Sequence, residues 1–156
     1  MTEQWVIDGY NLLNAFPECH SGKPKPTRED FLAALSGFAS HRQAQMLVVL
    51  DGTGDPSELD VFRTERFRVV YSLKVSADSC IERTLFESAD PSRCSVVTND
   101  RAITAIARGK GASVVPCAEF FRMWSLAVGE QERIRHQNEA RNHGFNRPFD
   151  HKLKDL

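Results

Sequence analysis

Three short apolar runs, each leading to an aspartate, constrain the fold of this chain more than any other feature of its sequence. Residues 5–7, 46–50 and 95–98 have the length and composition of buried strands, and they lead to Asp8, Asp51 and Asp100. Residues 67–71 and 112–115 are two further predicted strands. Helical patterns separate these strands. The alternation predicts an α/β fold with a mainly parallel sheet that helices cover on both faces.

Capping residues and apolar spacing place the predicted helices. Thr27 and Ser76 are suitable N-caps, and the helix after Ser76 is expected to cover residues 77–88. Residues 101–108 and 118–128 are two more predicted helices, whereas residues 53–66 are turn-rich and residues 21–26 predict a surface loop. The predicted apolar face consists of Phe31, Leu32, Leu35, Phe38 and Ala39 in the helix after Thr27 and of Cys80, Ile81, Leu85 and Phe86 in the helix after Ser76.

Length and composition indicate one globular domain with a polar extension. With 156 residues, 41% of them hydrophobic and 26% charged, the chain is long enough to bury a core. We expect the domain to span residues 1–128, and residues 129–156 to form a charged helical extension that ends in a mobile tail. The net charge of −1 excludes a bulk polycation, so any nucleic-acid site on this chain has to be a local patch.

The sequence shows neither a membrane span nor a secretion signal. No apolar run approaches the ~18 residues of a transmembrane helix, and the N-terminus lacks a basic region followed by a long apolar stretch. We therefore expect a cytoplasmic protein with no membrane partner. The four cysteines form no C-x-x-C pair, and reduced thiols are expected at Cys19, Cys80, Cys94 and Cys117.

The aspartates after the strands predict an acidic site at one edge of the sheet. Parallel strands end at the same edge, where ligands bind in such folds, so Asp8, Asp51 and Asp100 are expected to converge. Asp78 and Glu82, on one face of the 77–88 helix, are further candidates. Crowded carboxylates repel one another unless they share a cation, and hard oxygen ligands favour Mg²⁺ or Mn²⁺. A single aspartate after a strand is commonly only a turn residue, but three favour a metal site for phosphate chemistry.

Polar residues beside these aspartates have two interpretations each. Asn11 is placed to orient a carboxylate or water or to contact a phosphate, and its alternative role is a helix cap. Thr98 and Asn99 are candidates to position a water molecule, and their alternative role is strand-end hydrogen bonding. Residues 51–54, with the sequence DGTG, predict a plain turn because they lack the lysine and the length of a phosphate-binding loop.

Four sequence blocks carry a family resemblance. They are VIDGYNLL at residues 6–13, VVLDG at 48–52, SADSCIE at 76–82 and VTNDR at 97–101. In this order they resemble NYN domains, specifically the YacP-like branch of the PIN-like nuclease superfamily. The resemblance covers residues 4 to about 125 and implies a Rossmann-like α/β/α sandwich that cleaves RNA with a divalent metal. It implies catalytic and metal-site roles for Asp8, Asp51, Asp78 and Asp100, and a polar catalytic role for Asn11.

Two positions depart from the pattern of that family. Ser79 stands where the family often has a second acidic residue, and Asn99 stands where it often has serine. Neither change removes one of the four principal carboxylates, but both bear on how many metal ions the site takes and how tightly.

Basic residues near the third predicted strand and after Asp100 predict contacts with RNA. Contacts from such residues to phosphates would supply affinity without choosing a base sequence, and a solvated surface is the alternative role of each. Tyr10 and Phe16 are candidates for base stacking, although core packing is favoured for Phe16. The predicted RNA-binding residues are Arg63, Arg66, Arg68, Lys74 and Arg101.

These features predict a metal-dependent endoribonuclease that acts on mRNA or another cellular RNA, free or on the ribosome. One alternative is a phosphotransfer domain of the receiver or haloacid-dehalogenase kind. It is disfavoured because Tyr10 stands where the second aspartate of a D-x-D motif would be, and Pro116 where a receiver has lysine. The other alternative is a non-catalytic RNA- or ribosome-binding module that retains the fold. It is disfavoured because an idle cluster of carboxylates would cost stability.

Overall fold

Five parallel strands form the centre of the fold. The computed structural model describes residues 2–16 and 25–154. The strands lie in the order β3-β2-β1-β4-β5, and every neighbouring pair is parallel. This confirms the predicted α/β class and the parallel sheet. The bounds are β1 Gln4–Asp8, β2 Gln45–Leu50, β3 Phe67–Tyr71, β4 Cys94–Val97 and β5 Ser113–Val115.

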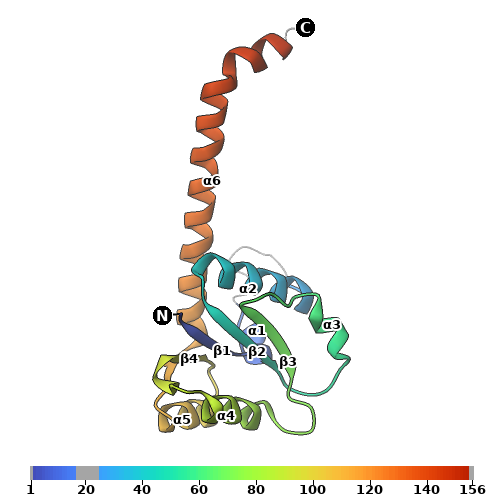
Figure 1. Ribbon diagram of the computed structural model, residues 1–156, viewed down its shortest axis with the longest axis vertical. Coiled ribbons are helices and arrows are strands. Elements are labelled where there is room, and N and C mark those ends of the chain that lie inside the picture. The colour runs from blue at the N-terminus through green and yellow to red at the C-terminus, as the bar shows by residue number, and fades with distance from the viewer. Residues whose placement is uncertain (1, 17–24, 155–156) are drawn as a thin grey trace. The chain divides into compact units, whose positions relative to one another are not determined.

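Helices cover both faces of the sheet, as Figure 1 shows, with α2 and α3 on one side and α4 and α5 on the other. Thr27 caps α2 by accepting a hydrogen bond from the backbone N–H of Asp30 at 3.1 Å, and Ser76 caps α4 through the N–H of Ser79 at 3.2 Å. Both predicted caps are thus confirmed. The bounds are α1 Gly9–Asn14, α2 Arg28–Arg42, α3 Pro56–Asp60, α4 Ala77–Glu87, a 3₁₀ turn at Pro91–Arg93, α5 Arg101–Gly109 and α6 Cys117–Lys154.

Each face of the sheet has its own apolar core. On one face, Val6 and Val96 of the sheet pack with Ile81 and Leu85 of α4 and with Ile103 of α5. On the other face, aromatic rings meet edge to face, with Phe120 5.7 Å from Trp5 and 5.5 Å from Phe38 between ring centroids. The predicted apolar residues of α2 are all buried. The two cores fix the helices against the two faces of the sheet, and this fixes where the strand ends lie.

Three local predictions were wrong or incomplete. Phe86 is 75% exposed, and the buried face of α4 uses Ala77 instead. The turn-rich stretch contains the short helix α3, which Asp55 caps by accepting the N–H of Ser57 at 2.9 Å. Asp8 is followed directly by the short helix α1, which the predicted helices did not include. Helices this short gain little from propensity and depend on tertiary contacts, so apolar spacing does not reveal them.

Contacts within the chain divide it into two units, Met1–Phe121 and Arg122–Leu156. Helix α6 is continuous to Lys154, where the sequence predicted a helix end near residue 128 and a separate extension. Cys80, Cys94 and Cys117 are free thiols, as predicted, whereas Cys19 and most of the predicted loop at 21–26 lie outside the described residues. Within the described ranges, no helix combines the length and the apolar character needed to cross a bilayer.

Candidate active site

The predicted acidic residues lie at the carboxyl edge of the sheet. Asp8 is the last residue of β1, and β1 lies between β2 and β4, so Asp51 after β2 and Asp100 after β4 flank it. Asp78 lies in the first turn of α4. The parallel topology brings these four positions to one edge although they span most of the domain's sequence.

Asp8 is the buried centre of this group. Its side chain is 7% exposed, and its Oδ2 accepts a hydrogen bond from the hydroxyl of Thr98 at 3.0 Å. Burial raises the pKa of Asp8 from 3.8 to about 6, against the Thr98 hydrogen bond, which lowers this pKa. The charges of Asp100, Asp78 and Asp51 each raise this pKa further. The Asp8 carboxylate therefore sits in the combined field of the other three.

Gly9 lets the start of helix α1 lie close against strand β2. A Cβ atom at this position would lie 2.6 Å from the Cδ2 of Leu50 and 3.0 Å from the backbone oxygen of Val49, both in the neighbouring strand β2. A larger residue would push α1 away from the sheet. The Asp-Gly pair thus serves the close packing that places Asp8 and Asn11 at the same edge.

Asp51 connects the end of β2 to the start of α4. Its Oδ1 accepts the backbone N–H of Ala77 at 3.0 Å and lies 3.4 Å from the donating hydroxyl of Ser72. The same hydroxyl oxygen accepts the N–H of Gly52 at 3.0 Å. One carboxylate oxygen of Asp51 therefore orients the helix that carries Asp78, and the carboxylate as a whole is exposed to solvent.

Asp100 is the N-cap of α5, a role that the sequence analysis did not predict. Its Oδ1 accepts the N–H groups of Ala102 at 2.8 Å and Ile103 at 3.1 Å. The side chain is half-buried, and its position at the helix N-terminus favours the negative charge. A carboxylate has two oxygens, so this cap leaves Oδ2 available to a ligand.

Asn11 is the centre of a polar network beside Asp8. Its Oδ1 accepts the backbone N–H of Asn99 at 2.8 Å and lies 3.4 Å from the Sγ of Cys117. Asn99 in turn accepts the N–H of Cys117 on its Oδ1 at 2.9 Å. Burial, and next the charge of Asp8, raise the pKa of Cys117 to about 11, so its thiol stays protonated and can donate. Thr98 and Asn99 thus make the strand-end hydrogen bonds that were the alternative to holding a water molecule.

Asp78 and Glu82 differ in how closely they approach the group. Asp78 is half-buried and is one of the charges that raise the pKa of Asp8, whereas Glu82 is exposed and is not among them. Glu82 lies one helical turn later, about 6 Å further along the axis. Asp78 is therefore the better placed of the two for a shared ligand.

The chemistry of the four carboxylates fits a hard divalent cation. Asp8 is crowded by like charge, and bound positive charge would relieve that crowding. Among the side chains that the structure describes, no three or more acidic, histidine or cysteine groups are gathered closely enough to hold a metal ion together. Mg²⁺ commonly keeps several water ligands and takes one or two carboxylates. The arrangement is thus an open acidic edge.

Comparison with known proteins identifies the family. The model of the YacP-like NYN domain matches residues 5–155. The chain belongs to this family. The fold agrees with that assignment: the crystal structure of Rae1 (YacP) from Bacillus subtilis superposes with a TM-score of 0.68 at 18% identity, over 99% of this chain and 91% of that one. Its W164L mutant gives a TM-score of 0.71 at 19% identity, over 89% and 85%. The search of curated proteins found no match.

The predicted basic residues of this NYN domain do not form one group. Lys74 follows β3 at the carboxyl edge, and Arg101 begins α5 directly after Asp100. Arg66 lies at the opposite edge, where it donates to the backbone oxygen of Gln43 at 3.0 Å. Arg63 and Arg68 line a pocket along β3, which is the edge strand. Of these five residues, only Lys74 and Arg101 therefore follow strands at the acidic edge of the sheet.

Arg28 is a basic residue near this edge that the sequence analysis missed. It is the first residue of α2, and its Nη1 donates to the hydroxyl of Tyr71 at 3.0 Å. A hydrogen bond with the side chain of Tyr10 is the largest of the effects that raise the pKa of Arg28. Its Nη2 lies 3.2 Å from Glu29 and 3.7 Å from Glu58. No local motif marks Arg28, because Tyr71 and Glu58 come from distant parts of the sequence.

Phe16 has the core role that the sequence analysis favoured. Its ring packs edge to face against Phe31 at 6.4 Å and against Phe121 at 4.9 Å between ring centroids. It is half-buried in this aromatic cluster. Tyr10 is held by Arg28, which leaves its ring half-exposed beside Asp8 and Asn11.

Proposed function

We propose that this NYN domain is a metal-dependent endoribonuclease that hydrolyses RNA phosphodiester bonds at the carboxyl edge of its sheet. YacP-like NYN domains are PIN-like domains, a family of RNA-processing nucleases. One observation carries the proposal for this chain. A buried carboxylate, Asp8, lies in the field of three others, and its pKa is raised to about 6. Such perturbed groups concentrate at functional sites.

The carboxylates of Asp8, Asp51, Asp78 and Asp100 are the residues that would hold Mg²⁺ or Mn²⁺, with Glu82 as an outer candidate. When bound, the ion supplies positive charge to the scissile phosphate and lowers the pKa of a coordinated water molecule. The Thr98 hydroxyl holds Asp8 in one orientation through the 3.0 Å hydrogen bond. Asp51 and Asp100 are held by backbone N–H groups in the same manner.

Asn11 is proposed to contact the scissile phosphate. Its side-chain oxygen is occupied by the N–H of Asn99, so the orientation of its amide is fixed. The amide nitrogen makes no hydrogen bond with a residue that the structure describes, and its two N–H donors are available to a phosphate oxygen. The thiol of Cys117 contributes to the same orientation by donating to Asn11.

Cleavage assays test the proposal directly. Pure protein is incubated with mixed cellular RNAs, free or on ribosomes, with Mn²⁺, with Mg²⁺ or with EDTA, and the new 5′ ends are mapped. We expect new ends only with a divalent metal, with 5′-phosphates and 3′-hydroxyls at the cut. RNA that is bound but uncut under all conditions would refute the nuclease and favour the non-catalytic RNA-binding module.

A further inference from the structure

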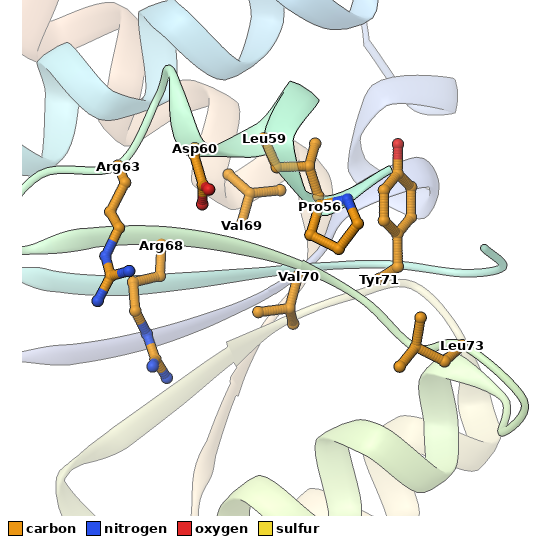
Figure 2. A pocket seen from close by; sticks show the side chains of 9 residues that line it. All are labelled: Pro56, Leu59, Asp60, Arg63, Arg68, Val69, Val70, Tyr71 and Leu73. Atoms are coloured by element: carbon orange, nitrogen blue, oxygen red, sulfur yellow. The ribbon is translucent and has the colours of Figure 1, made fainter. Parts of the chain in front are cut away.

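The pocket along the edge strand β3 has a charge and a location that the proposed cleavage site does not use. It has a volume of about 280 Å³ and is lined by residues of helix α3, of strand β3 and of the segments that follow them. Figure 2 shows Arg63 and Arg68 at one end of it and Tyr71 and Leu73 at the other. Its lining is otherwise mainly apolar: Pro56, Leu59, Val69 and Val70, with one carboxylate, Asp60.

Within the described part of the chain, the two arginines have no partner that would neutralise them. Both side chains are exposed, and neither forms a hydrogen bond or an ion pair with any residue that the structure describes. In contrast, Arg28, Arg42 and Arg93 in the same unit pair with carboxylates at 2.8–3.7 Å. With Asp60 as the one acidic group in the lining, the pocket carries an excess of positive charge that suits an anion.

The other end of the pocket reaches the acidic edge. Tyr71 ends β3, and the next residue, Ser72, donates to Asp51. Leu73 is 55% exposed, and its N–H donates to the oxygen of Gly52 at 2.8 Å. Its φ of 65° is costly for a branched side chain, so the contact with the Asp51 loop holds an apolar group in a strained position at this end.

We infer that this pocket is a second RNA subsite. In it, the RNA that leaves the acidic edge places a phosphate on Arg63 and Arg68 and a base against Leu73 and Val70. The inference rests on the proposed function. The distance suits a flanking nucleotide rather than the cleaved one, because Arg68 lies three residues, about 10 Å, from the end of β3. An acidic peptide would satisfy the arginines equally, but the continuity with the acidic edge favours RNA.

Binding in EDTA tests the subsite without cleavage. The affinity for a labelled single-stranded RNA is measured at several salt concentrations for the wild-type protein and for Arg63→Ala/Arg68→Ala. We expect the double variant to bind roughly ten-fold more weakly, as for a lost charged hydrogen bond. The negative slope of log affinity against log salt is expected to become shallower by about 0.7 for one lost phosphate contact. An unchanged affinity and slope would overturn the inference.

Two matched variants separate this effect from charge loss and misfolding. Arg93→Ala/Lys110→Ala removes the same charge far from β3 in the sequence, and it is expected to leave the slope unchanged. Arg63→Lys/Arg68→Lys keeps the charge and is expected to keep the slope. A slope that falls equally in the three variants would contradict a local phosphate contact. The inference would also be contradicted if RNA binding does not depend on the two arginines while the binding of a polyglutamate peptide does.

The same proteins distinguish this inference from the proposed function. Cleavage of the labelled RNA is assayed in parallel with Mn²⁺. Arginine-dependent binding without any cleavage would refute the nuclease and leave the subsite standing. Cleavage together with arginine-independent binding would refute the subsite and leave the nuclease standing.

Discussion

At the scale of single residues, Asp8, Asp51 and Asp100 are each held at the acidic edge by a different hydrogen-bond donor. Strand ends in a parallel sheet share an edge, so the sequence alone indicated that Asp8, Asp51 and Asp100 converge. It did not indicate that Asp51 holds the start of α4 or that Asp100 caps α5. These roles depend on which backbone N–H groups point at each carboxylate, and this is decided by packing between distant segments. Arg28 was missed for the same reason.

The first prediction concerns the stability of the metal-free protein. Because the folded-state pKa of Asp8 is raised to about 6, its stabilising effect is complete below pH 4 and is lost as the pH rises through 6. A shift of this size corresponds to about 3 kcal/mol at most. Asp8→Asn is therefore expected to be more stable than wild type at pH 7.5 in EDTA, by about 1–3 kcal/mol, and equal to it at pH 4. Urea unfolding at both pH values measures this.

Asp90→Asn is the matched control for that experiment. Hydrogen bonds from Ser92 lower the pKa of Asp90, so replacing this carboxylate removes a favourable charge. We expect this variant to be no more stable than wild type at pH 7.5. If the stability of Asp8→Asn relative to wild type is lower at pH 7.5 than at pH 4, the crowding of carboxylates around Asp8 is misassigned.

The second prediction ranks the two acidic residues of α4. Asp78→Asn is expected to lower metal-dependent RNA cleavage more than Glu82→Gln, because Asp78 is half-buried and acts on Asp8 while Glu82 is exposed one turn away. Initial cleavage rates at fixed Mn²⁺ measure the order. The opposite order would mean that the helix presents its second turn, and not its first, to the metal.

At the scale of helices and strands, sequence patterns predicted the long elements well and the short ones poorly. The apolar positions of α2 and the caps Thr27 and Ser76 are local signals, and they appear in the structure as expected. Phe86 followed the same apolar spacing but is exposed, because the packed face of α4 passes through Ala77 instead. The short helices α1 and α3 consist of six and five residues, too few to show a period.

The third prediction separates the two roles of Asp100 in α5. Asp100→Asn keeps a capping side chain, whereas Asp100→Ala removes the acceptor of the Ala102 and Ile103 N–H groups. Relative to Asn, the Ala variant is expected to lose about 1 kcal/mol of unfolding free energy. Both variants are expected to lose cleavage by at least ~10²-fold, because both remove a proposed metal ligand. A cleavage loss that follows stability alone would assign Asp100 a purely structural role.

At the scale of the whole molecule, the alternation of strands and helices was sufficient to predict a parallel sheet, although it does not contain the strand order. That order places β1 in the centre, with β2 and β4 beside it. The central position explains why Asp8 is the buried member of the acidic group. The extent of α6 was not predictable from local signals, since Gly129 and Pro148 both favour interruption of a helix.

The fourth prediction concerns the C-terminal segment. Residues 130–141 are exposed along their whole length, so they bury little surface. Truncation after Asn142 is expected to shift the Tm by no more than a few degrees, and calorimetry measures this. Whether this segment extends an RNA footprint is decided by the salt dependence of RNA affinity. A footprint role predicts a shallower slope for the truncated protein, and equal slopes would exclude it.

The central claim is that the carboxylates at the edge of the sheet form the site at which RNA is hydrolysed. The most direct test is the single-turnover cleavage rate of wild type, Asp8→Asn and the control Asp90→Asn, all purified free of metal and assayed with the same Mn²⁺. We expect at least a ~10²-fold loss for Asp8→Asn with an intact fold, and wild-type rates for Asp90→Asn. Full activity in the Asp8→Asn protein would contradict the proposal that these carboxylates form the cleavage site.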